Sequence, residues 1–394
     1  MLPIHQSIQI TYHYSIHFTN HLFAHENHLI RDVINVGDAK TPKKILCVVD
    51  SGVCRHHPGL LDAIASYCHY HESFLSLVCS PLIIEGGESA KNDPLHVTTI
   101  HEAIHHYGIC RHSYIIVIGG GALIDIVGYA AATAHRGVRL IRVPTTVLAQ
   151  NDSGVGVKNS INAFGKKNFI GTFAPPVAVL NDAHFLTTLS LRDWRCGISE
   201  AIKVALLKDV EFFDFIEEKA AQLVARDMQA MLWLIYRCAQ LHLNHIATGG
   251  DPFEFGSSRP LDFGHWAAHK LEQLSNYRLR HGEAVAIGIA LDSTYSYLAG
   301  LLPRQDWQRI LELFSILGLA VYTPELSLHL YDRNDPSCIF TGLQEFKEHL
   351  GGQLTLPLLE RIGRGIEANQ VDEQRMIKSI VLLEEYQSTY KQEQ

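Results

Sequence analysis

The first half of the chain alternates short, continuous apolar runs with stretches of helical spacing. Strand-like runs occupy 44–50, 113–118 and 139–143, and helical spacing covers 97–107 and 123–133. Each run ends in polar, proline or glycine-rich positions, which is typical of parallel strands covered by helices on both faces. The pattern predicts an α/β nucleotide-binding domain with a Rossmann-like parallel sheet over residues 1–181.

The pattern changes near Asp182. Long amphipathic stretches then dominate, at 210–224, 228–246 and 307–317, and strand-like runs become rare. Apolar residues recurring every three to four positions favour helices. We therefore expect a second, all-α domain over residues 182–394.

Composition excludes several classes of protein. Of 394 residues, 47% are hydrophobic and 19% are charged, which favours a large core over disorder. The net charge of −8 gives no basic footprint for nucleic acid. We find no apolar run of membrane-spanning length, no signal-peptide pattern and no C-x-x-C pair among the eight cysteines. We expect a reduced, cytoplasmic protein.

Three clusters in the second half offer ligands for a zinc-type cation. They lie at 198–203, 263–269 and 280–283, and they supply Glu200, His265 and His281. One carboxylate and two imidazoles leave coordination positions open, as in catalytic rather than structural zinc sites. The alternatives are a surface ion pair between Glu200 and Lys203, which share a helix face, and packing roles for the histidines. Three such clusters in one domain favour the metal site.

His269 follows His265 by four residues, so both imidazoles share one face of a predicted helix. A metal can bind one ring while the other moves protons near neutral pH. His269 is therefore a candidate acid/base group.

A glycine-rich turn, Gly119-Gly-Gly121, separates a predicted strand from a predicted helix. Glycines at that place let the backbone approach a pyrophosphate at the helix N-terminus. Asp50 ends an earlier strand, where a carboxylate can accept from a ribose hydroxyl, and Glu88 and Lys91 follow another. The alternative is a plain tight turn.

Asp152, Lys158, Lys167 and Asn168 lie within a short, glycine-rich segment. Carboxylate, amide and ammonium groups on such a segment suit a polar, anionic substrate. The alternative is a solvated surface loop.

Together these motifs resemble 3-dehydroquinate synthase and, more broadly, the sugar phosphate cyclases that share its fold. The matching segments are 119–125, 144–152, 167–168, 200–203, 263–265 and 281–285. They fall in the family's order over about residues 40–290, and the last hundred residues match loosely. The resemblance implies a dehydroquinate synthase-like fold, an NAD cofactor, a divalent metal (zinc, or cobalt) and a homodimer.

The resemblance also implies a role for individual residues. NAD contacts would be Asp50, Glu88, Lys91, Gly119, Gly120, Gly121, Asp125, Thr145 and Thr146. Metal ligands would be Glu200, His265 and His281. Catalytic groups would be His269, Lys203, Asp152 and Lys158, and substrate contacts would be Arg136, Lys167, Asn168, Asp262, Arg259 and His349. Arg136 would hold the substrate phosphate across a dimer.

In this family, NAD transiently oxidises a substrate hydroxyl that the metal polarises. The ketone acidifies the neighbouring C–H bond, phosphate leaves by β-elimination, and NADH returns the hydride. Ring opening and an intramolecular aldol addition then form a carbocycle. The resemblance therefore implies a phosphate-eliminating lyase with no net redox change.

Departures from the dehydroquinate synthase pattern concern the substrate. Asp262 and Ser258 stand where the pattern has Asn and Arg, with Arg259 one residue out of register, and Asn244 replaces a lysine. Losing two cations argues against a substrate carboxylate. An aspartate at position 262 resembles the pattern of 2-epi-5-epi-valiolone synthase, which takes sedoheptulose 7-phosphate. That enzyme usually lacks the second histidine, which this chain keeps as His269.

Near the C-terminus, Lys347 and His349 are alternatives for a further active-site cation. The sequence predicts a sugar phosphate cyclase whose substrate is a ketose phosphate without a carboxylate. The alternatives are a true 3-dehydroquinate synthase with Arg259 in the carboxylate site, an iron-type alcohol or glycerol dehydrogenase, and a non-catalytic homologue.

Overall fold

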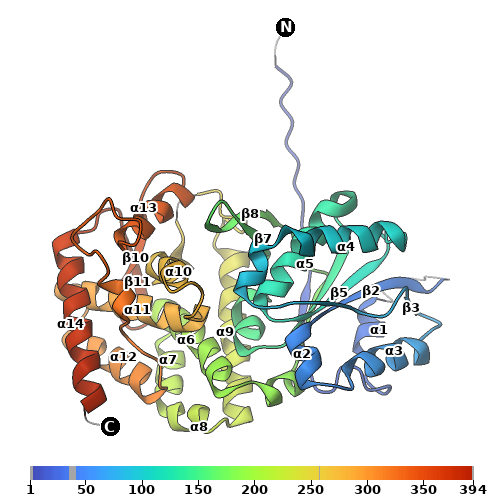
Figure 1. Cartoon of the computed structure of the whole chain (residues 1–394), viewed down its shortest axis with the longest axis horizontal. Helices are drawn as coiled ribbons and strands as arrows, with labels where there is room; N and C mark the ends of the chain where they lie inside the picture. Colours follow the sequence, from blue (N-terminus) through green and yellow to red (C-terminus); the bar gives the residue numbers. More distant parts are fainter. Residues whose placement is uncertain (1–2, 35–40, 257, 393–394) are drawn as a thin grey trace.

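The computed structural model describes residues 3–34, 41–256 and 258–392 (Figure 1). Strands gather in the half formed by the first part of the chain, and helices dominate the other half. β9 ends at Asp182 and the first long helix of the second half begins at Leu191. The domain division after residue 181 stays a prediction.

A parallel sheet forms the centre of the first half, as predicted. The strand order is β1-β9-β6-β5-β2-β3, and β4 also pairs with β2. The strands are β1 Ser15–Thr19, β2 Lys43–Asp50, β3 Leu75–Leu77, β4 Leu82–Ile84, β5 Tyr114–Gly119, β6 Arg139–Pro144 and β9 Ala178–Asp182. Each of these pairs runs parallel.

Helices cover both faces of this sheet. They are α1 Leu29–Ile34, α2 Ser51–His56, α3 Leu60–Tyr70, α4 Pro94–His106 and α5 Gly121–Thr133. In β2, Cys47 belongs to the apolar cluster with α1 and α3, whereas Val48 belongs to the cluster with α4 and α5. Both side-chain directions of the strand are therefore buried, which explains its continuous apolar run.

The glycine-rich segment 152–168, for which the alternative was a solvated surface loop, has regular structure. A short π-helix at Ala149–Ser153 leads into an antiparallel hairpin of β7 Lys158–Ala163 and β8 Lys166–Phe173. The hairpin lies outside the main sheet, beside the helical half (Figure 1). It gives Lys158, Lys167 and Asn168 fixed positions that a loop would not.

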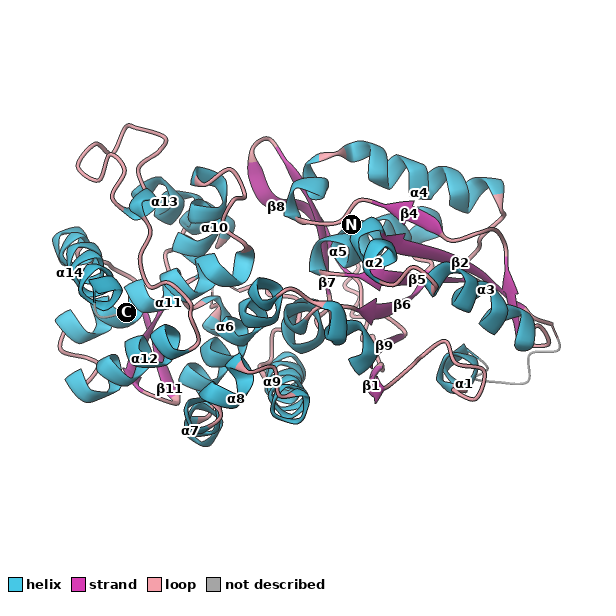
Figure 2. Cartoon of the chain, turned by 60° about the horizontal axis from the view of Figure 1, so that its bottom comes forward, coloured by secondary structure: helices cyan, strands magenta, loops and turns pink. Residues whose placement is uncertain are grey.

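The second half is helical, with one addition to the all-α expectation. Its helices are α6 Leu191–Lys208, α7 Val210–Glu218, α8 Ala220–Val224, α9 Met228–Thr248, α10 His265–Leu274, α11 His281–Leu298, α12 Arg304–Ile316, α13 Phe340–His349 and α14 Glu373–Gln392 (Figure 2). The amphipathic stretch 210–224 is two helices, because Lys219 between them is non-helical. The addition is an antiparallel hairpin of β10 Leu356–Arg361 and β11 Arg364–Ala368.

α11 is the central helix of this half. It packs against α6, α10, α12 and α14, and most of its residues are buried. Such a helix is apolar nearly all round, because neighbours surround it. No helix in the described ranges is both long and apolar enough to cross a bilayer.

Candidate active site

A cleft of about 1530 Å³ lies between the two halves. The carboxyl ends of β2, β5 and β6 open on one side of it, where parallel α/β sheets usually bind their ligands. Helices α6, α9, α10, α11 and α13 contribute the other side. Most of the predicted site residues therefore line one space.

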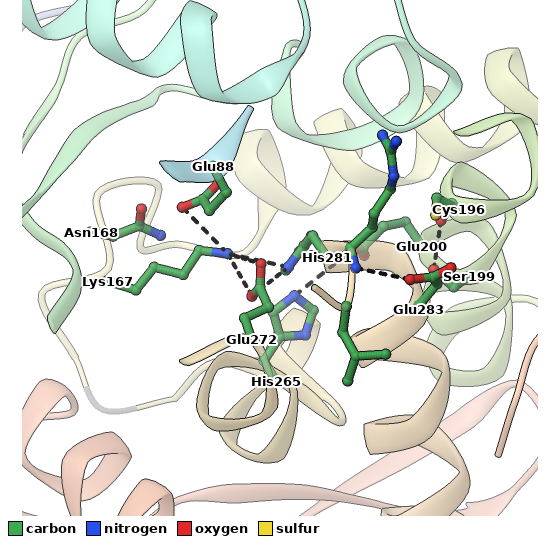
Figure 3. A network of polar contacts seen from close by, with 12 residues as sticks. Glu88, Lys167, Asn168, Cys196, Ser199, Glu200, His265, Glu272, His281 and Glu283 are labelled. Atoms are coloured by element: carbon green, nitrogen blue, oxygen red, sulfur yellow. Dashed lines mark hydrogen bonds and ion pairs between the residues drawn. The ribbon is translucent and has the colours of Figure 1, made fainter. Parts of the chain in front are cut away.

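The three candidate metal ligands come from three helices that meet at its floor (Figure 3). Glu200 is in the middle of α6, and His265 and His281 are the first residues of α10 and α11. Glu200 Oε1 lies 3.5 Å from His265 Nε2 and 3.2 Å from His281 Nε2. One ligand atom from each residue falls within 4.8 Å of the others.

Two glycines allow these helix ends to approach. Gly264, at the N-cap of α10, has a left-handed φ of 77° and packs on the backbone of α11. A Cβ atom on Gly282 would lie 2.0 Å from the Cys196 carbonyl oxygen of α6. Only glycine fits such close backbone contacts, so these positions place His265 and His281 beside Glu200.

The donor set suits a divalent cation. Both carboxylate oxygens of Glu200 are buried without a hydrogen-bond partner of good geometry, although Lys203 Nζ lies 2.6 Å from Oε2. Burial favours the protonated acid, but Lys203 and His265 lower the pKa of Glu200 well below its usual value. An ionised carboxylate facing two imidazoles is a ligand set with open positions. Among the described residues, this is one of two groupings with metal-ligand spacing.

His269 lies one turn along α10 and lines the same cleft. Its ring centroid is 5.4 Å from that of His265 and 5.9 Å from that of His281. Burial and the nearby Lys167 ammonium lower the pKa of His269 well below its usual value. The ring is therefore neutral, and one of its two nitrogens is an acceptor.

The residues expected to hold NAD surround the opposite end of the cleft. Asp50, Glu88, Lys91, Gly120, Gly121, Asp125, Thr145 and Thr146 line it, and Gly119 lies behind them as the last residue of β5. Gly120 is the N-cap of α5, so the first N–H groups of this helix are free of intrahelical partners. A Cβ atom on Gly121 would lie 2.5 Å from Ser153 Oγ. This edge fits a pyrophosphate.

Lys91 is hydrogen-bonded to Asn168, although the family resemblance assigns Lys91 to NAD and Asn168 to the substrate. Lys91 Nζ donates to Asn168 Oδ1, lies 2.6 Å from Asp125 Oδ2 and lies 3.2 Å from Ser160 Oγ. The Lys91 side chain is only 2% exposed. Lys91 therefore connects the β7–β8 hairpin to α5, and only a small part of its side chain is exposed to the cleft.

Asp152 pairs with a histidine that the sequence analysis missed. His242 Nδ1 of α9 lies 2.7 Å from Asp152 Oδ1, and both residues line the cleft. Burial opposes ionisation, but Lys203 and His242 lower the pKa of Asp152. Asn244, expected in place of a lysine, is exposed and does not line the cleft. The α9 face toward the cleft carries His242 and His245, a spacing of three residues that could have identified them.

Arg259 is turned toward its own loop. Its Nη1 donates to the Gly256 and Ser258 carbonyls at 2.5 and 3.0 Å. Its Nη2 donates to the Glu254 carbonyl at 2.6 Å, and its Nε lies 3.1 Å from Glu254 Oε2. Arg259 does not line the cleft.

Asp262 and His349 line the cleft near Lys158. Burial opposes the ionisation of Asp262, but Lys158 and His265 lower its pKa. Lys158 Nζ forms an ion pair with Glu254 at 2.6 Å. This end of the cleft therefore presents a carboxylate where the dehydroquinate synthase pattern has an amide.

The remaining predicted residues lie elsewhere. Arg136 is exposed at the end of the short 3₁₀ helix Ala134–Arg136 and does not line the cleft of its own chain. Lys347 is also exposed outside the cleft, so His349 is the alternative that reaches it. Ser258 Oγ bonds to Glu367 Oε1.

Comparison with known proteins agrees with the geometry. Family models described as 3-dehydroquinate synthase N-terminal and C-terminal match residues 81–196 and 197–333. The 3-dehydroquinate synthase of Shewanella sp. (strain MR-4) is 35% identical over 295 residues, 75% of this chain and 79% of that protein. The 2-epi-5-epi-valiolone synthase of Streptomyces hygroscopicus subsp. jinggangensis (strain 5008) is 32% identical over 368 residues, 91% and 84%.

Solved structures extend the likeness to the whole fold. The structure of 2-epi-5-epi-valiolone synthase from Streptomyces hygroscopicus subsp. jinggangensis 5008, with NAD+ and Zn2+ bound, has a TM-score of 0.85 at 30% identity and covers 97% of this chain and 100% of its own. A 2-deoxy-scyllo-inosose synthase complexed with carbaglucose-6-phosphate, NAD+ and Co2+ shares the fold, with a TM-score of 0.73 at 23% identity over 93% and 95% of the two chains. This chain belongs to the 3-dehydroquinate synthase family of sugar phosphate cyclases.

Proposed function

We propose that this protein is a phosphate-eliminating cyclase that uses NAD and a divalent metal, zinc or cobalt, on a ketose phosphate without a carboxylate. Its proposed substrate is a seven-carbon ketose phosphate of the sedoheptulose 7-phosphate type. The absence of a substrate carboxylate is proposed because of Arg259. Its guanidinium group bonds to Gly256, Ser258 and Glu254 and does not face the cleft.

The charges around this position support the proposal. A substrate carboxylate needs a free arginine or lysine, because a bidentate or charge-assisted pair offsets its desolvation. Here Asp262 lines the cleft and remains ionised, and Lys158 is paired with Glu254. A hydroxyl can donate to Asp262, whereas a carboxylate would be repelled. The site therefore favours a neutral, hydroxylated end of the substrate.

Each group at the floor of the cleft has a proposed role. Glu200, His265 and His281 would hold the metal, and the β5–α5 turn with Asp50 would hold NAD. When bound, the metal would polarise a substrate hydroxyl and NAD would accept and return a hydride. His269, which lines the cleft beside the metal ligands, would transfer protons to and from the substrate.

The polar groups on either side would orient the sugar. Lys203 stays charged, since Glu200 and Asp152 raise its pKa against the effect of burial, and it can donate to a substrate oxygen. The Asp152 carboxylate, fixed by His242, can accept from a hydroxyl. Lys158, Lys167, Asn168 and His349 complete the proposed substrate contacts, and Arg136 would reach the phosphate from a second copy in a homodimer.

Two alternatives remain on the same residues. A true 3-dehydroquinate synthase would need Arg259 to exchange its loop carbonyls for a substrate carboxylate. An iron-type dehydrogenase would leave Lys158 and Asn168 without a phosphorylated substrate. A non-catalytic homologue is disfavoured, because the metal and NAD residues lie in one cleft.

The described cysteines are all free, which supports a reducing, cytoplasmic location.

The substrate class is tested by parallel assays. Protein supplied with NAD and Zn2+ is given sedoheptulose 7-phosphate or the seven-carbon keto-acid phosphate of dehydroquinate synthases, and released phosphate is measured with time. We expect kcat/KM at least about 10-fold higher for the ketose, because one unpaired carboxylate costs more than about 1.4 kcal/mol. A preference for the keto acid would overturn the substrate assignment and favour the first alternative.

A further inference from the structure

Glu272 lies behind the three candidate metal ligands and is assigned no role by the family motifs above. It is on α10, one turn after His269, and its side chain is 1% exposed. Glu272 Oε2 lies 3.1 Å from His281 Nδ1, while the other ring nitrogen of His281 lies 3.2 Å from Glu200 Oε1 (Figure 3). The two nitrogens of one imidazole thus face two different carboxylates.

This arrangement fixes which nitrogen can bind a metal. A histidine that ligates a metal through one nitrogen usually donates its other N–H to a carboxylate, which sets the tautomer and the ring orientation. Lys167 Nζ also lies 3.3 Å from His281 Nδ1, but an ammonium group cannot accept a hydrogen bond, so Glu272 is the group here that can accept an Nδ1–H. In that tautomer the Nε2 lone pair of His281 points toward Glu200 and His265. The ring then needs no reorientation when a cation binds.

Glu272 is itself held by a lysine from the other side of the cleft. Lys167 Nζ, on β8, lies 2.9 and 2.7 Å from the two carboxylate oxygens of Glu272. It lies 3.7 Å from Glu88 Oε1, and its side chain is 6% exposed. A buried carboxylate needs such a partner to stay ionised. The hairpin of the sheet half therefore reaches the back of the helical half's metal site.

A second grouping of His269, Glu272 and His281 also has metal-ligand spacing. Lys167 occupies both oxygens of Glu272, so a cation bound there would face an ammonium group at hydrogen-bond distance. The carboxylate is therefore better suited to support His281 than to ligate.

We propose that Glu272 is a positioning residue that orients His281 for the metal, and that Lys167 completes this support from across the cleft. The metal site is then built by both halves of the molecule. This inference rests on the proposed function, because it assumes that Glu200, His265 and His281 bind the metal.

Metal affinity of the metal-free protein tests the proposal without substrate or turnover. Zn2+ and Co2+ are titrated calorimetrically into the wild type, Glu272→Ala, Glu272→Gln and Lys167→Met. The matched control is Glu345→Gln. Glu345, on α13, pairs with Lys270 of α10, the helix that carries Glu272, and it contacts no candidate metal ligand. Thermal unfolding of each metal-free variant identifies any that fails to fold. If Glu272→Ala does not fold, the metal affinity of the isosteric Glu272→Gln tests the proposal instead.

We expect Glu272→Ala to weaken metal binding by about 10- to 100-fold, as for other outer carboxylates. Glu272→Gln should fall between Ala and wild type, because its amide oxygen can still accept the His281 N–H. Lys167→Met should also weaken binding, and both Glu272 variants should shift the visible Co2+ spectrum. Glu345→Gln should match the wild type.

Two results would overturn the inference. One is unchanged affinity and spectrum in Glu272→Ala. The other is loss of binding in Glu272→Ala with normal binding in His265→Ala, which would make Glu272 a ligand. Failure of the proposed function looks different: the wild type would bind no metal, or Glu200→Ala and His265→Ala would both bind as tightly as the wild type.

Discussion

Asp292 is a carboxyl group buried in the helical half, and it ties α11 to the start of α10. Its Oδ1 accepts from Trp266 Nε1 at 2.9 Å, and its Oδ2 accepts from the Gly264 N–H at 2.9 Å. The contact fixes the residues on either side of His265. Burial raises the pKa of Asp292 to about 7, although both hydrogen bonds oppose the shift.

This pKa predicts a pH dependence of stability. Between about pH 4 and pH 7 the folded protein binds a proton at Asp292 that the unfolded chain does not, so this group's contribution to the free energy of unfolding is lost as pH rises through that window. The loss reaches at most about 1.4 kcal/mol per pH unit. Urea unfolding of metal-free wild type and Asp292→Asn, from pH 5 to pH 8, should show the wild type losing stability relative to the variant. A difference that does not change with pH would contradict the assigned shift.

The sequence identified the candidate metal ligands but not every residue that supports them. Glu200, His265 and His281 could be found because ligand-type side chains lie in short clusters with recognisable spacing, and the structure brings them together. The spacing of His242 and His245 showed only that both share one helix face, and Glu272 had no such signal; neither tells whether the side chain meets a cleft formed by distant segments. Asn244, interpreted as replacing a substrate-binding lysine, is exposed and does not line the cleft, so its identity says nothing about the substrate.

At the scale of elements, the start of α10 depends on one glycine. Gly264 has a φ of 77°, and a Cβ atom there would lie 2.5 Å from the Ile289 backbone nitrogen of α11. A left-handed conformation costs a non-glycine residue about 1–2 kcal/mol, and the steric clash adds to this. We expect a side chain here to push the start of α10 away from α11 and so to displace His265 from Glu200.

Gly264→Ala should therefore lower both stability and metal affinity. The matched control is Gly300→Ala, because Gly300 also has a left-handed φ of 74° but nothing within 4 Å of its Cβ position. We expect the control to lose about 1–2 kcal/mol of unfolding free energy and keep its affinity for Zn2+. Calorimetric titration and urea unfolding measure the two effects. Equal metal affinity in both variants would show that Gly264 does not place the ligand.

Elements with a strong hydrophobic period were predicted well, and those fixed by tertiary contacts were not. The β2, β5 and β6 strands and α9 agree with their apolar runs and helical spacing within a few residues. The β7–β8 hairpin was not predicted, because its polar side chains hide the strand pattern. Buried Arg142 of β6 donates to the Gly154, Gly156 and Lys158 carbonyls, so a tertiary contact holds the start of this hairpin and the segment before it.

At the scale of the whole molecule, the cleft is held by contacts between its two sides. Lys167 reaches Glu272 of α10, and Lys166 reaches Glu348 of α13 at 2.9 Å. Both lysines belong to the hairpin of the sheet half. The two halves were predicted from their different periodicities, but a sequence pattern contains no information on how they meet. Only the structure shows that the residues proposed to bind NAD and those proposed to bind the metal line one cleft.

In the proposed reaction, NAD and the metal act on the same substrate carbon, and NAD is regenerated in every turnover. One measurement tests it most directly: sedoheptulose 7-phosphate is incubated with the Zn2+-loaded protein and a small fraction of an equivalent of NAD, while released phosphate and NADH absorbance are recorded together. We predict many phosphates released per NAD, a cyclic product by NMR and no accumulation of NADH. NADH that accumulates to the level of the added NAD, with phosphate still attached to the sugar, would contradict the account.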